Sequence, residues 1–144
     1  MLGSEKEIIS NYVDNGLVKI VFWPIVDFGP GSMNAHAAAD CIGRQSPDAF
    51  WNVHDRFFEN QRELSSADDA YFAAIAESVG VDVAQFNECY SSGEAHGHIT
   101  ALDSQRREAG IRQRPTFDIN GQQLFGAQPF AVFAEVIEAK LAGQ

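Results

Sequence analysis

The segment around Asn120-Gly121 constrains the fold more strongly than any other part of the sequence. It joins two short runs that are suited to strands, Thr116–Ile119 and Gln122–Phe125. Asn-Gly favours a two-residue hairpin turn because both residues tolerate positive φ angles. Pro129 then begins a run whose apolar residues recur at helical spacing. The end of the chain therefore predicts a β-hairpin followed by a closing helix.

The beginning of the chain predicts one helix and one strand. Ser4 and Glu7 have the spacing of a capping box, and the helix that they would open carries its apolar residues on one side: Ile8, Ile9, Tyr12 and Val13. The run Leu17–Trp23 is almost entirely apolar and rich in β-branched and aromatic residues. Such a run is typical of a strand that is buried on both faces. Pro24 would end it, because proline cannot extend the hydrogen-bond ladder.

Between these ends, residues 32–109 predict an all-helical stretch. Ser46-Pro47 begins one of its helices with a capping serine and a proline at the first helical position. Gly80 and Gly110 stand where two others would end. A chain of 144 residues is the size of one domain. We therefore expect a single domain over residues 1–144.

Composition excludes several classes of function. The formal net charge of −10 argues against binding to nucleic acid or to an anionic membrane, since both need clustered Lys and Arg. The sequence has no long apolar run that could span a membrane and no signal-peptide pattern at its start. Cys41 and Cys89 do not have metal-ligand spacing, and His96 and His98 would point in different directions on a helix. We expect no metal and no cofactor.

The most specific motif runs from Gly110 to Gly121. A glycine that ends a helix is followed by Arg114-Pro115-Thr116-Phe117 and then by the hairpin. This string resembles the proline loop of the thioredoxin superfamily, in which the proline is cis. Residues 126–130 resemble the closing segment of DsbA-like proteins, and residues 32–61 and 83–89 resemble their helical insertion. The resemblance implies an α/β, thioredoxin-like fold with residues 32–109 as an insertion.

One essential motif of that family is missing, because the sequence contains no Cys-x-x-Cys. In DsbA-like proteins a central strand leads to Cys-x-x-Cys at the head of a long helix, whereas this chain begins inside or just after that helix. We therefore expect an N-terminally truncated form, without the first strand and the redox motif, that is inactive alone. A complete non-redox relative is the other interpretation. Loss of a central strand would expose two unpaired edges, so we also expect a homo-oligomer through that face.

The resemblance also implies roles for individual residues. The parent protein would exchange disulfides with cysteine-containing substrate proteins, and Arg114 and Pro115 would bind the substrate. No catalytic residue would remain in this chain. Arg114 stands where the family commonly has Thr or Val, and its guanidinium would lower the pKa of a nearby thiol. Because some relatives have a structural disulfide in the helical block, we expect one between Cys41 and Cys89, with two buried free thiols as the alternative.

The expected disulfide has a consequence for the compartment. Disulfides persist in oxidising surroundings, so the parent protein would be extracytoplasmic, in the periplasm or cell envelope. The alternative function is a non-catalytic peptide-binding module that keeps the proline-loop groove. A relative of the glutathione transferases or of isomerases would need a serine or similar group at the start of the family's first helix. This sequence does not contain that helix start.

Overall fold

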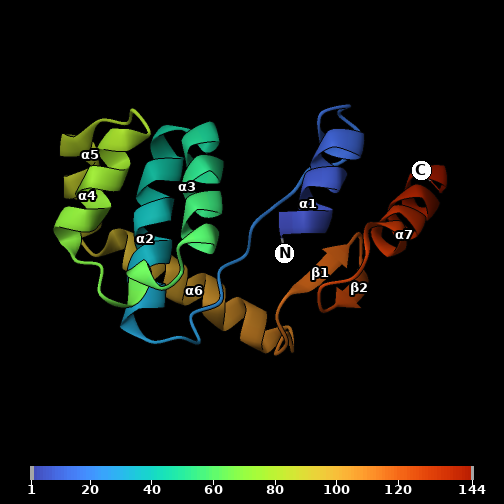
Figure 1. Ribbon diagram of the computed structural model, residues 1–144. Coiled ribbons are helices and arrows are strands. Elements are labelled where there is room, and N and C mark those ends of the chain that lie inside the picture. Colours follow the sequence, from blue (N-terminus) through green and yellow to red (C-terminus); the bar gives the residue numbers. More distant parts are fainter. Residues whose placement is uncertain (1, 144) are drawn as a thin grey trace. The chain divides into compact units, whose positions relative to one another are not determined.

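The computed structural model describes residues 2–143. Within them the chain divides into two compact units (Figure 1). The first unit combines the residues up to Phe22 with those from Ala109 onward, and the second runs from Trp23 to Glu108. Each unit has its own cluster of buried apolar side chains.

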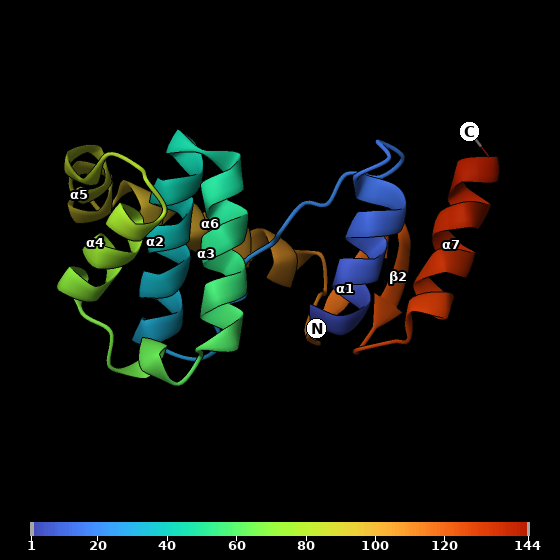
Figure 2. The same ribbon diagram turned by 45° about the horizontal axis from the view of Figure 1, so that its top comes forward.

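The first unit contains two helical segments and the hairpin. Helix α1 (Leu2–Ile8) continues directly into a π-helical turn, Ile9–Val13. Strands β1 (Thr116–Ile119) and β2 (Gln122–Phe125) form an antiparallel pair in which Thr116 faces Phe125. Helix α7 (Phe130–Ala142) closes the chain beside this hairpin (Figure 2). The predicted hairpin and closing helix are confirmed.

The turn forms as its sequence predicts. Asn120 and Gly121 have φ angles of 48° and 86°, the left-handed region that an Asn-Gly turn requires. The Gly121 N–H also donates a hydrogen bond of 2.7 Å to the Asp118 carboxylate. This turn fixes the register that places Phe117 and Ile119 on one face of β1.

The core of the first unit joins α1 to α7. Ile8 and Tyr12 are buried with Phe133 and Ile137, and the rings of Phe117 and Phe133 meet edge to face at 4.7 Å. The predicted capping box is wrong, because α1 already begins at Leu2. Ser4 lies inside the helix, and its hydroxyl donates to the Gln128 carbonyl oxygen at 2.9 Å. The serine therefore joins α1 to the segment before α7.

The strand expected at Leu17–Trp23 does not form, since residues 18–27 are not assigned to any strand. Its alternating pattern nevertheless persists. Val18 and Ile20 pack against the core, while Leu17 and Val21 are 53% and 67% exposed. A strand requires a ladder partner, and among the described residues β1 pairs only with β2. The segment is thus strand-like in its side chains but belongs to no ladder among the described residues.

The second unit is entirely helical. It contains α2 (Pro30–Gln45), α3 (Pro47–Glu59), a 3₁₀ turn (Glu63–Ser65), α4 (Asp69–Ser78), α5 (Val83–Ser91) and α6 (Glu94–Glu108). Helix α2 packs against each of the other four helices. Its alanines, such as Ala37 and Ala38, are fully buried, and their small side chains let the neighbouring helices approach closely. No helix in the described part of the chain is long and apolar enough to cross a membrane.

Candidate functional site

The loop before β1 is the first candidate site. Helix α6 ends at Glu108, and the chain then leads through Gly110 to Arg114-Pro115, whose peptide bond is cis. The Pro115 carbonyl oxygen accepts a hydrogen bond of 2.9 Å from the Gly126 N–H. The Thr116 hydroxyl donates to the Gln113 carbonyl oxygen at 2.8 Å. These bonds fix the loop on both sides of the proline.

The loop presents its residues at the start of an open strand edge. Arg114 is exposed and Pro115 is half-buried. One edge of β1 pairs with β2, and within residues 2–143 no strand pairs with the other edge. An open edge of this kind can accept an extended peptide through backbone hydrogen bonds. The loop can therefore bind and orient an extended segment, but it contains no thiol of its own.

The two cysteines of the chain lie together in the helical unit. Cys41 on α2 and Cys89 on α5 are joined by a disulfide, with their Cα atoms 5.8 Å apart. The bond closes a loop of 48 positions, and the loop-entropy model gives about 4 kcal/mol of stabilisation for that length. The cysteines thus cross-link two helices that are distant in sequence.

A network of charges holds the start of the helical unit on α6. The Arg106 guanidinium contacts the Asp27 and Asp103 carboxylates at 2.6 and 2.7 Å. Arg107 contacts the same two carboxylates at 2.8 and 2.7 Å. Asp103 also accepts a hydrogen bond of 3.2 Å from the Val26 N–H. Sequence reasoning missed this network, although Asp103 has the i,i+3 and i,i+4 spacing to both arginines.

The environment of Asp103 determines its charge. Burial alone would raise the pKa of this carboxyl, but hydrogen bonds from Arg107, Val26 and Arg106 outweigh it and lower the pKa below its ordinary value. Asp103 therefore stays ionised and keeps its two arginine partners. The network pins the loop that follows residue 22 to α6.

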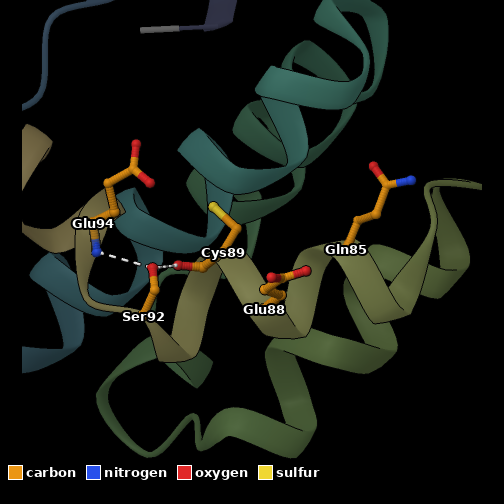
Figure 3. Close-up of a pocket in the computed structure, with 5 residues that line it drawn as sticks. All are labelled: Gln85, Glu88, Cys89, Ser92 and Glu94. Carbon is orange, nitrogen blue, oxygen red and sulfur yellow. Dashed lines mark hydrogen bonds between the residues drawn. The ribbon is translucent and has the colours of Figure 1, made fainter.

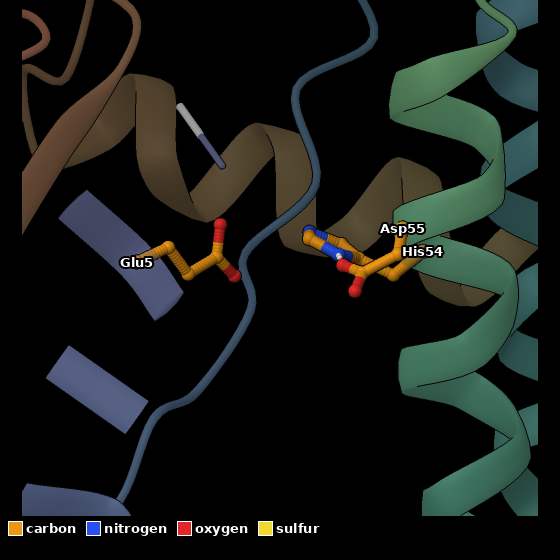
Figure 4. A group of neighbouring side chains, drawn as sticks. All are labelled: Glu5, His54 and Asp55. Carbon is orange, nitrogen blue, oxygen red and sulfur yellow. Dashed lines mark hydrogen bonds and ion pairs between the residues drawn. The ribbon is translucent and has the colours of Figure 1, made fainter. Parts of the chain in front are cut away.

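The histidines occupy separate places in the helical unit. His54 packs between Trp51 and Phe58, with ring centroids 5.1 and 4.7 Å away, and its Nδ1 lies 3.0 Å from the Asp55 carboxylate on the same helix (Figure 4). His98 lies 3.0 Å from Asp40. His96 contacts the Asn34 amide oxygen at 3.4 Å. His96 and His98 thus have different partners.

Comparison with known proteins identifies the family. The family model described as "Thioredoxin" matches residues 2–139. The chain belongs to the thioredoxin family. Its similarity to two disulfide bond formation proteins and to one solved structure identifies it as a DsbA-like member of the thioredoxin superfamily.

Two curated relatives of this thioredoxin-family chain are named for disulfide bond formation. Disulfide bond formation protein D of Bacillus subtilis (strain 168) is 23% identical over 141 residues, which are 96% of this chain and 64% of the relative. "Probable disulfide bond formation protein D" of Bacillus cereus is 25% identical over 114 residues, 76% of this chain and 53% of the relative. The chain thus spans between about half and two thirds of these curated relatives.

A solved structure confirms the thioredoxin-like fold. The crystal structure of oxidised BdbD from Bacillus subtilis superposes with a TM-score of 0.80 at 20% sequence identity. The superposition covers 95% of this chain and 76% of the BdbD chain. The α/β, thioredoxin-like fold class expected from the sequence is therefore correct.

Proposed function

We propose that this chain is the substrate-binding part of a DsbA-like protein thiol–disulfide oxidoreductase and that it lacks the redox cysteines of that enzyme. The observation that carries the proposal is the proline loop. Arg114-Pro115 stands at the head of β1, anchored on both sides, beside an open strand edge. The names of two curated relatives support a role in disulfide formation.

The binding step follows from the backbone geometry. A substrate segment that carries a cysteine extends along the residues before Pro115 and adds to the chain as a strand would. Arg114 and Pro115 are the residues that it meets first. In the parent reaction a substrate thiolate attacks the enzyme disulfide. One enzyme sulfur then leaves as a thiolate, and a second substrate thiolate resolves the mixed disulfide.

This chain cannot supply those enzyme sulfurs in the family's form. Its two cysteines stand 48 positions apart and are bonded to each other, and no Cys-x-x-Cys occurs in the sequence. The partial coverage of the curated relatives, 53% and 64%, supports a fragment of a longer enzyme. The exchange step then belongs to the parent protein, and this chain contributes binding.

Arg114 would tune that parent reaction. A guanidinium beside the redox cysteines stabilises the thiolate, lowers the thiol pKa and makes the disulfide more oxidising. In a form that carries Cys-x-x-Cys, Arg114→Thr should raise the pKa of the reactive thiol, as followed by thiolate absorbance against pH. An unchanged pKa would show that the side chain has no such effect.

The binding step can be tested on the chain itself. Reduced insulin B chain with carbamidomethylated cysteines is an extended peptide without a free thiol. Added to the ¹⁵N-labelled chain, it should shift the amide signals of Gln113, Arg114 and Thr116 and leave Gly121 at the far end of the hairpin unchanged. Pro115→Ala should weaken these shifts, and Arg112→Ala is the matched control. Shifts confined to the helical unit would contradict the proposal.

A second candidate function is a peptide-binding module that performs no redox chemistry. The observation that favours it is an anchored proline loop in a sequence without Cys-x-x-Cys. Both candidates predict peptide binding, so the DNA sequence upstream of the coding region is needed to distinguish them. An in-frame strand and Cys-x-x-Cys just upstream of the Met1 codon would support the oxidoreductase, and a stop codon there would support the module.

Compartment and assembly complete the proposal. The Cys41–Cys89 disulfide supports an extracytoplasmic parent protein, because cytosolic thiols are kept reduced. The exposed side chains of Leu17 and Val21, on a segment that forms no strand within the described residues, support assembly of this chain into a homo-oligomer through the strand edge of the first unit. The helical stretch 32–109 is, on this proposal, the insertion that DsbA-like proteins carry.

A further inference from the structure

The disulfide of the helical unit is exposed on one side only. Cys41 is 1% exposed and lies in the core of the unit. Cys89 is half-buried and lines an open pocket of about 340 Å³ together with Gln85, Glu88, Ser92 and Glu94 (Figure 3). One sulfur therefore belongs to the core and the other to the pocket wall.

This asymmetry determines which sulfur an external thiol can reach. Disulfide exchange requires a thiolate to contact one sulfur directly while the other sulfur leaves. Cys41 is enclosed by the packed side chains of α2 and its neighbours, and such interiors leave little room for an entering molecule. Cys89 borders open space. Attack can thus occur only at Cys89, with Cys41 as the leaving sulfur.

The charges of the pocket decide which thiols enter. Glu88 and Glu94 both line it, and the Arg44 guanidinium opposes them. The Arg44 guanidinium contacts Glu94 at 2.7 Å and Asp40 at 2.9 Å. These carboxylates outnumber the guanidinium, so the surroundings of Cys89 repel an approaching anion.

We propose that the pocket beside Cys89 is a thiol-exchange site that takes small thiols whose attacking form has little net negative charge. The entering thiolate forms a new S–S bond with Cys89. The Cys41–Cys89 bond breaks, and its electron pair leaves on Cys41, which then takes a proton from solvent. The thiolate of a second equivalent then attacks the small-thiol sulfur of the mixed disulfide, so that the oxidised small disulfide is released and Cys89 leaves as a thiolate, which takes a proton from solvent. This site is independent of the proline loop.

Three thiols of different charge test the proposal on the oxidised, folded chain. The attacking thiolates of cysteamine, 2-mercaptoethanol and glutathione have net charges of about 0, −1 and −2. After acid quenching and alkylation of free thiols, peptide mass mapping should find the small thiol on Cys89 and the alkyl group on Cys41. Rates per thiolate at low salt should fall from cysteamine to glutathione.

Two variants that change the charge of the pocket in opposite directions make the test specific. Glu94→Gln removes one carboxylate and releases Arg44, and at about 10 Å in water this should raise the glutathione rate about fourfold, the 2-mercaptoethanol rate about twofold and the cysteamine rate not at all. Arg44→Gln should lower the glutathione rate by a similar factor. Glu59→Gln, outside the pocket at the end of α3, is the matched control and should change none of the rates.

The opposite results would overturn the proposal. An adduct on Cys41 would show that the buried sulfur is the one attacked. Exchange that begins only when urea unfolds the chain would show that the pocket does not admit a thiol. Equal rate changes for all three thiols in Glu94→Gln would show that the pocket does not select thiols by their charge.

Discussion

At the scale of single residues, His36 shows how burial decides a charge. Its Nε2 lies 3.3 Å from the Ile25 carbonyl oxygen. Burial lowers the pKa of this imidazole, the Ile25 carbonyl opposes that effect, and His54 nearby lowers the pKa further, whereas Asp103 raises it. The net lowering means that the folded chain holds His36 neutral where an unfolded chain would protonate it.

The pH dependence of folding follows from this shift. A histidine whose pKa is lowered on folding gives stability that is present above the unfolded value of about 6.5 and is lost as the pH falls below it. His36→Gln keeps a hydrogen-bond donor but cannot titrate, so it should flatten the loss of stability as the pH falls below about 6.5. The change is at most about 1.4 kcal/mol per pH unit, the linkage of one proton. Urea unfolding across that range measures it, and an unchanged slope would contradict the assignment.

At the scale of elements, side-chain partners distant in sequence explain what sequence reasoning found and missed. The start of α3 could be predicted because its signal is local: Ser46 caps the Ala49 N–H at 3.2 Å and Pro47 is the first helical residue. The Ser4–Glu7 spacing has the same local form, yet Ser4 bonds instead to Gln128, which is 124 positions away. Local patterns predict an end of a helix only where no distant partner takes the capping side chain.

The candidate site divides in the same way. Arg114 and Pro115 could be located because a contiguous motif carries them. The pairing of Asp27 with Arg106 joins residues 79 positions apart, and no local pattern identifies such a partner. The strand at Leu17–Trp23 was predicted from its composition. A strand forms only where a neighbouring strand offers hydrogen-bond partners, and the composition of the segment does not show whether such a neighbour exists.

The charge network on α6 gives a prediction for that element. The Arg106 side chain is 3% exposed and Arg107 is 45% exposed. Arg106→Met takes the buried guanidinium away from Asp103 and Asp27 and leaves them that of Arg107, so it should lower the free energy of unfolding by about 3 kcal/mol. Arg107→Met removes an exposed partner and should cost about 1 kcal/mol or less. Urea unfolding of both variants measures the difference, and equal losses would show that burial of Arg106 does not matter.

At the scale of the whole molecule, the chain combines a helical core with a two-stranded sheet. The helical unit buries its largest side chains, including Phe72 and Phe86, almost fully. Within residues 2–143, the sheet of the first unit has two strands, and Leu17 and Val21 are exposed. Exposed apolar residues on a segment that belongs to no sheet favour association with another chain.

The proposed oligomer gives the prediction at this scale. Leu17→Lys combined with Val21→Lys should convert the oligomer to a monomer in sedimentation equilibrium without loss of helical circular dichroism, because both side chains are exposed. Phe28→Lys, which replaces an apolar side chain that is 72% exposed in the other unit, is the control and should leave the mass unchanged. A wild-type chain that sediments as a monomer would refute the proposed assembly.

The central claim is that this chain keeps the binding loop of a disulfide oxidoreductase without its redox cysteines. The most direct test is reduction of insulin by dithiothreitol in the presence of substoichiometric amounts of the chain. The account predicts a precipitation curve that coincides with the curve without protein, for the wild type and for Cys41→Ala with Cys89→Ala alike. Accelerated precipitation by the wild-type chain would contradict it.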